Sequence, residues 1–229
     1  MIIIPAAGEG RRFTEAGYKG PKHEIDLDGR PMVARVIDNV LQLDVQSLPD
    51  LRIFVADQGY VGKTKGAIDT ILKVEMLVHI DPNERLVIAN CDQLLDLTTY
   101  DPAKPSGNGI VFTFKSANPA HSYVWTKKDK ITDIIEKPRD PVAQGWTQAV
   151  SGVYVFNRAE PFLTACKEAQ AKLSEPGWTG AEQYISSALK IMIEQGYGLY
   201  AEDVPTAILG TPEDFQRFET ALAVIRSIS

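Results

Sequence analysis

The stretch that follows the first apolar run of the chain holds residue types that bind phosphate. In the sequence IIIPAAGEGRRF, Gly8 and Gly10 allow the backbone to come close to a ligand and to point amide groups at it. Arg12 and Lys22 supply cationic donors for phosphate oxygens. The pattern predicts a phosphate-binding loop. Two alternatives stay open: a dinucleotide-binding turn, whose third glycine is replaced by Phe13, and a surface turn with solvated charges.

A carboxylate follows a second buried strand. Residues 85–90 read RLVIAN, and Asp92 comes directly after the intervening Cys91. A carboxylate in this position can hold Mg²⁺ against phosphate oxygens. The alternative is an aspartate that caps the next segment. Cys91 is typical of a small buried hydrophobic residue rather than of a ligand.

Alternating strands and helices must position these two motifs. In the first half we expect strands at residues 1–5, 51–56 and 85–90, and helices at residues 31–43 and 64–72. Pro31 suits the first position of its helix and Thr64 could cap the next one. Such alternation indicates a parallel sheet covered on both faces. Ligands in these folds bind outside the carboxyl ends of the strands.

The second half of the chain changes character. We expect four strands without helices between them, at residues 109–114, 122–126, 131–135 and 150–156, and then helices at residues 159–173, 180–195 and 212–228. Thr211 precedes Pro212 and two acidic residues, which is typical of a capped helix start. The prediction is an α/β, Rossmann-like fold in one domain, residues 1–229, with a mostly parallel, mixed sheet and helices on both faces.

Composition limits the range of functions. The 229 residues carry a formal net charge of -6, which argues against a nucleic-acid or anionic-membrane surface. The two cysteines show no metal-binding spacing, so we expect a reduced, cytoplasmic setting. The N-terminal apolar run does not match a signal peptide, and no segment reaches the length of a membrane span.

Six motifs in order resemble the sugar-phosphate nucleotidylyltransferase family. They are AGEGRRF with AGY and PK, TKGA at 64–67, IANCDQ at 88–93, EKP at 136–138, SGVYVF at 151–156 and LGTPED at 209–214. They look most like the short bacterial branch that includes CTP:phosphoglutamine cytidylyltransferases. The resemblance implies the nucleotide-diphospho-sugar transferase fold. It also implies a reaction in which a phosphorylated acceptor attacks the α-phosphorus of a nucleoside triphosphate, with CTP as the favoured donor.

The resemblance also assigns residues to the nucleotide. The implied nucleotide-binding set is Ala6, Ala7, Gly8, Gly10, Arg11, Arg12, Lys22, Thr64, Gly66, Ala67, Asn90 and Asp92. Within it, Arg12, Lys22 and Asp92 are the catalytic residues, and Asp92 holds Mg²⁺. Such chemistry needs positioning and charge neutralisation more than a protein nucleophile. For residues 64–67, a simple helix start is an equal alternative.

The acceptor side rests on four further residues. The resemblance implies that Glu136, Lys137, Gly152 and Glu182 face the phosphorylated acceptor, with Lys137 on its phosphate. Without the resemblance, Glu136 and Lys137 indicate a solvated turn. Glu182 also completes a capping box with Thr179, so a purely structural role stays open.

Two departures from the family pattern bear on mechanism. His23 and Glu24 follow Lys22 where the family has P-K-P-L-I, and no carboxylate stands ahead of Gly210 and Thr211. The competing functions are a nucleotide-sugar-dependent glycosyltransferase and an inactive nucleotide-binding homologue. The nearest D-x-D motif for the first, residues 26–28, falls before the first long helix. The sequence leaves the acceptor and the oligomeric state open.

Overall fold

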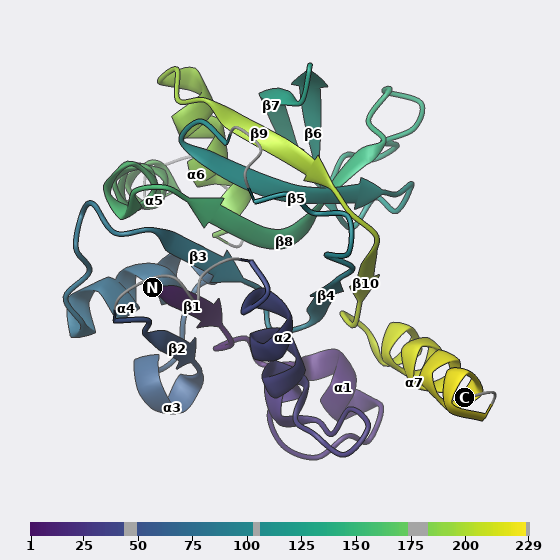
Figure 1. Ribbon diagram of the computed structural model, residues 1–229. Helices are drawn as coiled ribbons and strands as arrows, with labels where there is room; N and C mark the ends of the chain where they lie inside the picture. Colours follow the sequence, from purple (N-terminus) through teal and green to yellow (C-terminus); the bar gives the residue numbers. More distant parts are fainter. Residues whose placement is uncertain (44–49, 103–105, 174–182, 228–229) are drawn as a thin grey trace.

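An eight-stranded sheet forms the centre of the protein (Figure 1). The computed structural model describes residues 1–43, 50–102, 106–173 and 183–227. The strands lie in the order β2-β1-β3-β8-β5-β9-β7-β6. In that order their bounds are Ile53–Ala56, Ile2–Pro5, Leu86–Ala89, Gln148–Phe156, Gly109–Lys115, Leu199–Asp203, Lys130–Glu136 and Ser122–Lys127.

The sheet is mixed, as the sequence predicts. β2, β1 and β3 are parallel neighbours, and β9 is parallel to β5. β8 pairs antiparallel with β3 and β5, and β6 and β7 form an antiparallel hairpin. Antiparallel pairing is therefore more extensive than predicted. The carboxyl ends of β1 and β3 lie side by side, which places the glycine loop beside the segment that contains Asp92.

Helices and a short 3₁₀ turn join the strands. Their bounds are α1 Arg11–Glu15, η1 Lys22–Glu24, α2 Met32–Val40, α3 Gln58–Val61, α4 Ala67–Leu77, α5 Ala159–Leu173, α6 Ile185–Glu194 and α7 Pro212–Ser227. The bounds of α5 match the prediction, whereas α2 is shorter than predicted and α6 begins later, after Tyr184. No helix in the described ranges is both long and apolar enough to cross a membrane.

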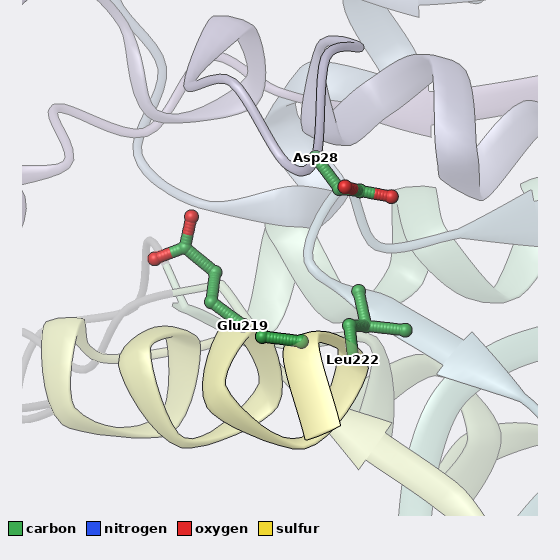
Figure 2. Close-up of a pocket in the computed structure, with 4 residues that line it drawn as sticks. Asp28, Glu219 and Leu222 are labelled. Carbon is green, nitrogen blue, oxygen red and sulfur yellow. The ribbon is translucent and has the colours of Figure 1, made fainter. Parts of the chain in front are cut away.

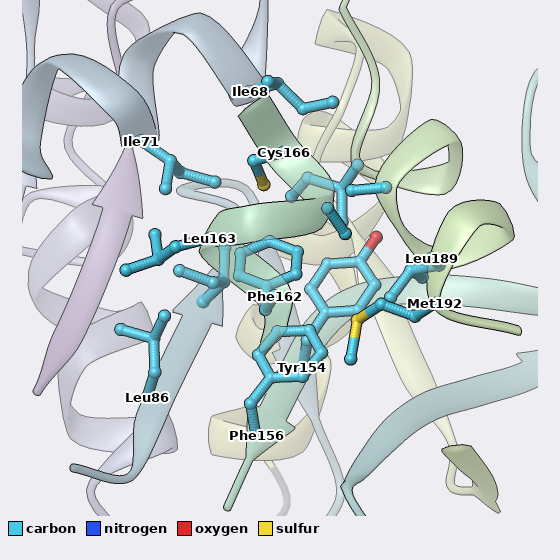
Figure 3. Packing of buried hydrophobic residues seen from close by; sticks show 14 of the residues in the cluster. Ile68, Ile71, Leu86, Tyr154, Phe156, Phe162, Leu163, Cys166, Leu189 and Met192 are labelled. Carbon is cyan, nitrogen blue, oxygen red and sulfur yellow. The ribbon is translucent and has the colours of Figure 1, made fainter. Parts of the chain in front are cut away.

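Two apolar layers cover the two faces of the sheet. On one face, α4, α5 and α6 pack against β1, β3 and β8 (Figure 3), where the rings of Phe156 and Phe162 stack with centroids 4.1 Å apart. On the other face, Val36 and Val40 of α2 pack against the alternate side chains of the same strands. Because successive side chains of a strand point to opposite faces, the apolar runs of β1 and β3 supply both layers.

A small second sheet connects the end of the chain to the segment after β3. β4 (Gln93–Leu95) pairs antiparallel with β10 (Thr206–Ile208), with Gln93 opposite Ile208. α7 then begins as predicted: the Thr211 hydroxyl accepts a hydrogen bond from the Asp214 amide at 3.2 Å. Near its start, α7 packs against α1 and the residues after it (Figure 1), because the ring of Phe215 contacts Phe13 and Tyr18 edge to face.

Candidate active site

The glycine loop runs from the end of β1 to the start of α1. Two hydrogen bonds fix its base: the Ala6 amide donates to Ala56 at 3.0 Å, and Gln58 Nε2 donates to the Ala7 carbonyl at 3.0 Å. Ala6 and Ala7 are buried. They therefore hold the loop, while Gly8 beyond them is exposed.

Gly10 brings the loop against Lys22. Its φ of +59° lies in the left-handed region, and a Cβ here would stand 3.1 Å from the Cβ of Lys22. A side chain at position 10 would thus push Lys22 away from the loop. The Lys22 ammonium also lies 5.1 Å from the centre of the Phe13 ring, which fills the place of the third glycine in a dinucleotide turn.

Lys22, Asp92 and Gly210 meet at the carboxyl ends of β1 and β3. The Lys22 ammonium donates one hydrogen bond to Asp92 Oδ2 and another, of 3.2 Å, to the Gly210 carbonyl. The side chains of Lys22 and Asp92 are 16% and 18% exposed, so they reach the surface only in part. An ammonium has three donors. No hydrogen-bond partner for the third is found among the described residues.

The two arginines of the loop take different positions from the ones predicted. Both lie on α1 rather than in a loop, since the helix starts at Arg11. The Arg11 side chain is 81% exposed and pairs with Glu9 at 3.1 Å, so it faces solvent rather than the interior of the loop. Arg12 is exposed, and its guanidinium makes no ion pair or hydrogen bond in the described part of the chain, although its charge acts on the Glu213 carboxylate of α7. Its guanidinium is free to contact a phosphate.

His23 turns away from this ligand-facing side. Its side chain is 6% exposed, and Nε2 lies 3.8 Å from Asp57 Oδ2 and 3.9 Å from Glu24 Oε1. Asp57 also caps α3 by accepting the Tyr60 amide. His23 is therefore buried beside two carboxylates, at distances longer than those of hydrogen bonds.

Gly152 packs against two carboxamides from the segment around Asp92. Its φ is +83°, and a Cβ here would lie 1.9 Å from Gln93 Oε1 and 2.4 Å from Asn90 Nδ2. The main-chain N–H of Asn90 donates a hydrogen bond to the Gly152 carbonyl at 2.9 Å. Gln93 Oε1 is buried without a hydrogen-bond partner in the described ranges. The structure thus brings a predicted acceptor residue and a predicted nucleotide residue together.

The start of α4 differs from the prediction. Ala67 is the first helical residue and Gly66 stands at the N-cap, so Thr64 is not the cap. Instead, the Thr64 hydroxyl accepts a hydrogen bond from Thr70 at 2.9 Å. Gly66 has a φ of +136°, and the backbone of Gln183 lies against it. The helix starts later than predicted because Gly66 adopts a conformation that a residue with a side chain rarely takes.

Glu136 and Lys137 at the end of β7 are held by hydroxyl groups. Glu136 Oε2 accepts hydrogen bonds from Ser122 and Ser186, each at 2.5 Å. Lys137 donates to the Tyr184 hydroxyl, and its ammonium lies 3.7 Å from the centre of that ring. Glu136 is partly buried, whereas Lys137 is exposed but lies against the Tyr184 ring. Glu182, the fourth predicted acceptor residue, lies outside the described residues.

The carboxylates of the D-x-D segment serve the local fold. Asp26 Oδ1 accepts the Gly29 amide at 2.8 Å, and Asp28 pairs with Arg35 at 3.3 Å. Asp28 also lines a pocket on the surface together with Glu219 and Leu222 of α7 (Figure 2). The described residues contain no group of three or more histidine, cysteine, aspartate or glutamate side chains that could hold a metal ion.

Two groups beside the site favour their neutral forms: Cys91, which is partly buried, and Tyr154, which is buried. Burial and, next, the Asp92 carboxylate raise the pKa of the Cys91 thiol to about 12. Burial and the Glu136 carboxylate raise the pKa of Tyr154 above its ordinary value. Neither group can be ionised near neutral pH, so neither is a nucleophile there.

Sequence reasoning missed several contacts of the site. It searched for a carboxylate ahead of Gly210, whereas the structure uses the Gly210 main-chain carbonyl on Lys22. The hydroxyls of Ser122, Tyr184 and Ser186 around Glu136 and Lys137 were not predicted either. The LGTPED motif contains Gly210 and was a signal for the first contact, while the sequence carries no signal for the other three.

The fold defines the structural class of the protein. The mixed sheet, with its parallel β2-β1-β3 unit, has the nucleotide-diphospho-sugar transferase fold. The nucleoside-diphosphate-sugar pyrophosphorylase of Vibrio cholerae RC9 has a TM-score of 0.77 at 20% identity, covering 96% of this chain and 100% of that chain. The inositol-1-phosphate CTP transferase of T. maritima has a TM-score of 0.64 at 16% identity, covering 93% and 90%. These structures confirm the predicted fold.

A curated relative supports the same class. The UTP–glucose-1-phosphate uridylyltransferase AglF of Haloferax volcanii is 25% identical, over 97% of this chain and 96% of the relative. No family model matches the chain. These relatives bear out the predicted enzyme class, that of a nucleotidyltransferase. They do not single out the short cytidylyltransferase branch to which the sequence motifs pointed.

Proposed function

We propose that the chain, as one domain, transfers a nucleotidyl group from a nucleoside triphosphate to a sugar 1-phosphate or a similar phosphorylated metabolite. An oxygen of the acceptor phosphate attacks the α-phosphorus and the bond to the β-phosphate breaks. The products are a nucleoside diphosphate conjugate and pyrophosphate. The names of the relatives, which include a uridylyltransferase and a CTP transferase, support this reaction.

The meeting of Lys22, Asp92 and Gly210 is the observation that carries the proposal. Three segments distant in sequence place one ammonium beside a carboxylate and a carbonyl, at the carboxyl ends of two parallel strands. The carboxylate and carbonyl hold the ammonium in one position without using its third donor. A fixed cation with a free donor suits a phosphate oxygen whose negative charge grows during the transfer.

The remaining chain residues supply positioning. The exposed Arg12 guanidinium contacts the phosphates as a fork, and the backbone amides near Gly8 and Gly10 contact them at close range. Residues 64–67 bind the nucleobase through main-chain groups, as the resemblance of the TKGA segment implies, and Gly66 lets this segment pack against the backbone of Gln183. On the acceptor side, Lys137 meets the acceptor phosphate, and Gly152 leaves room for the carboxamides of Asn90 and Gln93.

The donor set fits a single Mg²⁺ held mainly by the substrate. Asp92 contributes one carboxylate, and Mg²⁺ at phosphate sites typically uses one or two carboxylates together with substrate phosphates and water. The absence of a larger carboxylate cluster in the described ranges agrees with this arrangement. When bound, the ion offsets negative charge on the triphosphate.

The proposed donor is a pyrimidine nucleoside triphosphate, and the sequence motifs favour CTP. Cytosine and uracil differ by an amino donor against a carbonyl acceptor. A buried backbone group that the wrong base leaves unpaired costs about 1–3 kcal/mol, which predicts a preference of about tenfold or more.

A pyrophosphate-release screen tests the proposal. The purified chain is incubated with Mg²⁺, each of the four nucleoside triphosphates, and glucose 1-phosphate, inositol 1-phosphate or no acceptor. We expect pyrophosphate only with an acceptor, and a marked preference for one pyrimidine donor. Release of phosphate without acceptor would indicate a hydrolase, and the absence of any product would refute the proposed class.

Two lysine variants separate the site from the general fold. Lys22→Ala should abolish most turnover. Lys167→Ala is the matched control, because Lys167 also pairs with a carboxylate, Glu75 at 2.7 Å, but does so between α5 and α4. Equal activity of the two variants would contradict the role assigned to Lys22.

A further inference from the structure

Residues 183–186, which lead into α6, contact both halves of the proposed site. We call them the linking segment. They lie against residues 65–68 on the nucleotide side and against Glu136 and Lys137 on the acceptor side. The three segments are far apart in the sequence, so the folded chain brings them together.

The nucleotide side of the linking segment is joined through main-chain groups. The Gln183 amide donates to the Lys65 carbonyl at 3.0 Å, and the Gln183 carbonyl accepts the Ile68 amide at 3.1 Å. Between these bonds, a Cβ on Gly66 would lie 2.6 Å from the Gln183 nitrogen and 2.8 Å from its oxygen. The two backbones are in direct contact, so residues 65–68 cannot move without moving Gln183.

The acceptor side is joined through side chains. The Tyr184 hydroxyl accepts a hydrogen bond from Lys137, whose ammonium lies 3.7 Å from the ring centre. The Ser186 hydroxyl donates to Glu136 Oε2 at 2.5 Å. Lys137 has a φ of +45°, so its backbone is in the left-handed region as well. The positions of Glu136 and Lys137 therefore depend on the linking segment.

We propose that the linking segment couples donor binding to acceptor binding, with Tyr184 and Ser186 as positioning residues for Lys137 and Glu136. A nucleotide that orders residues 64–67 also orders Gln183 and, through the next three residues, the two acceptor groups. The acceptor then binds with a smaller ordering cost, which is positive cooperativity. Such coupling is typically 5- to 150-fold in affinity. This inference rests on the proposed function.

Amide hydrogen exchange tests the coupling when only a nucleotide analogue, and no acceptor, is added. The probes are the α,β-methylene analogues of CTP and of UTP, which bind without transferring a nucleotidyl group. In the unmodified chain we expect slower exchange at residues 64–68, 183–186 and 134–138. In the double variant Tyr184→Phe, Ser186→Ala, slowing should persist at residues 64–68 and vanish at residues 134–138.

A control variant separates a failure of the proposed coupling from a failure of the proposed nucleotide site. Tyr197→Phe with Ser187→Ala makes the same two chemical changes at other positions on or beside α6, and it should behave like the unmodified chain. Slowing at residues 64–68 without any at 134–138 in the unmodified chain would overturn the coupling alone. No slowing anywhere with either analogue would instead refute the proposed nucleotide site.

Turnover gives a second measurement of the same coupling. With glucose 1-phosphate as acceptor, the double variant should raise the KM of the acceptor at least fivefold. The affinity of the methylene analogue measured without acceptor should change less than twofold, because the bonds from Gln183 to residues 65–68 are intact. An at least fivefold loss of that affinity would contradict the assigned positioning roles.

Discussion

Gly152→Ala is the substitution whose effect the structure specifies most closely. At a φ of +83°, an added Cβ would stand 1.9 Å from Gln93 Oε1 and 2.4 Å from Asn90 Nδ2. The backbone strain of a left-handed alanine is about 1–2 kcal/mol. Moving two packed carboxamides adds a steric cost of about 1–3 kcal/mol. Because both obstructing atoms are at the ends of flexible side chains, the chain should still fold.

Gly196→Ala is the control for backbone strain. Gly196 has nearly the same φ, +86°, but a Cβ there would meet nothing within 4 Å. This variant should lower the melting temperature by about 2–8 °C and leave turnover unchanged. Gly152→Ala should lower the melting temperature further. It should also reduce turnover by about a hundredfold, since displaced groups at a reacting centre have effects of that size.

A third variant tests the steric explanation. Gln93→Ala in the Gly152→Ala background removes the nearest obstruction, so it should recover part of the lost melting temperature. The measurements are thermal unfolding followed by circular dichroism and pyrophosphate release. If Gly152→Ala and Gly196→Ala lose the same melting temperature and both keep full turnover, the reasoning about packing at Gly152 is wrong.

Three further predictions concern titratable groups. Asp92→Asn keeps the side-chain volume but removes the metal ligand, so turnover in Mg²⁺ should fall by about two to three orders of magnitude, as pyrophosphate release would show. Burial and then the carboxylates of Asp26 and Asp28 raise the pKa of Glu219 in the folded chain above its ordinary value of 4.5. Ionised Glu219 therefore destabilises the folded chain. The free energy of unfolding falls as the pH rises from below 4.5 through the raised pKa. Glu219→Gln should therefore increase the free energy of unfolding by about 0.2–1 kcal/mol at pH 7 and by less at pH 4, measured by urea denaturation. With a pKa of about 12, the Cys91 thiol should react with iodoacetamide at pH 8 about a thousandfold more slowly in the folded chain than in the unfolded chain.

The strands that could be predicted carry an apolar signal in the local sequence. β1 and β3 are apolar throughout and largely buried, whereas β6 and β7 contain exposed residues among their buried ones. β4, β9 and β10 are three to five residues long and partly exposed. They exist because each has a partner strand elsewhere, which periodicity within a short segment cannot reveal.

Short helices were missed for a related reason. α1 has five residues, RRFTE, and its one buried side chain is Phe13. A helix of this length is not stable from propensity alone, so contacts with Tyr18 and Phe215 maintain it. The sequence could therefore identify the glycine loop but not the helix into which the arginines fall.

For the candidate site, sequence motifs identified residues but not their pairing. Lys22 and Asp92 were both predicted to contact the nucleotide, and the structure adds that they also contact each other. That contact depends on β1 and β3 being parallel neighbours, as the alternation of strands and helices implied. The linking segment could not be predicted, because it depends on backbone contacts between Gly66 and Gln183.

The hydrogen bond from Lys22 to the Gly210 carbonyl spans 188 positions of the chain, which has a consequence for biosynthesis. A ribosome makes the glycine loop early and the Gly210 carbonyl only when nearly the whole chain has been translated. At about 5–20 residues per second, roughly ten seconds or more separate the two events. A nascent or truncated chain that ends before β10 lacks the carbonyl that helps to hold Lys22. The proposed site is therefore completed late in synthesis. We expect prematurely terminated chains to have no nucleotidyltransferase activity.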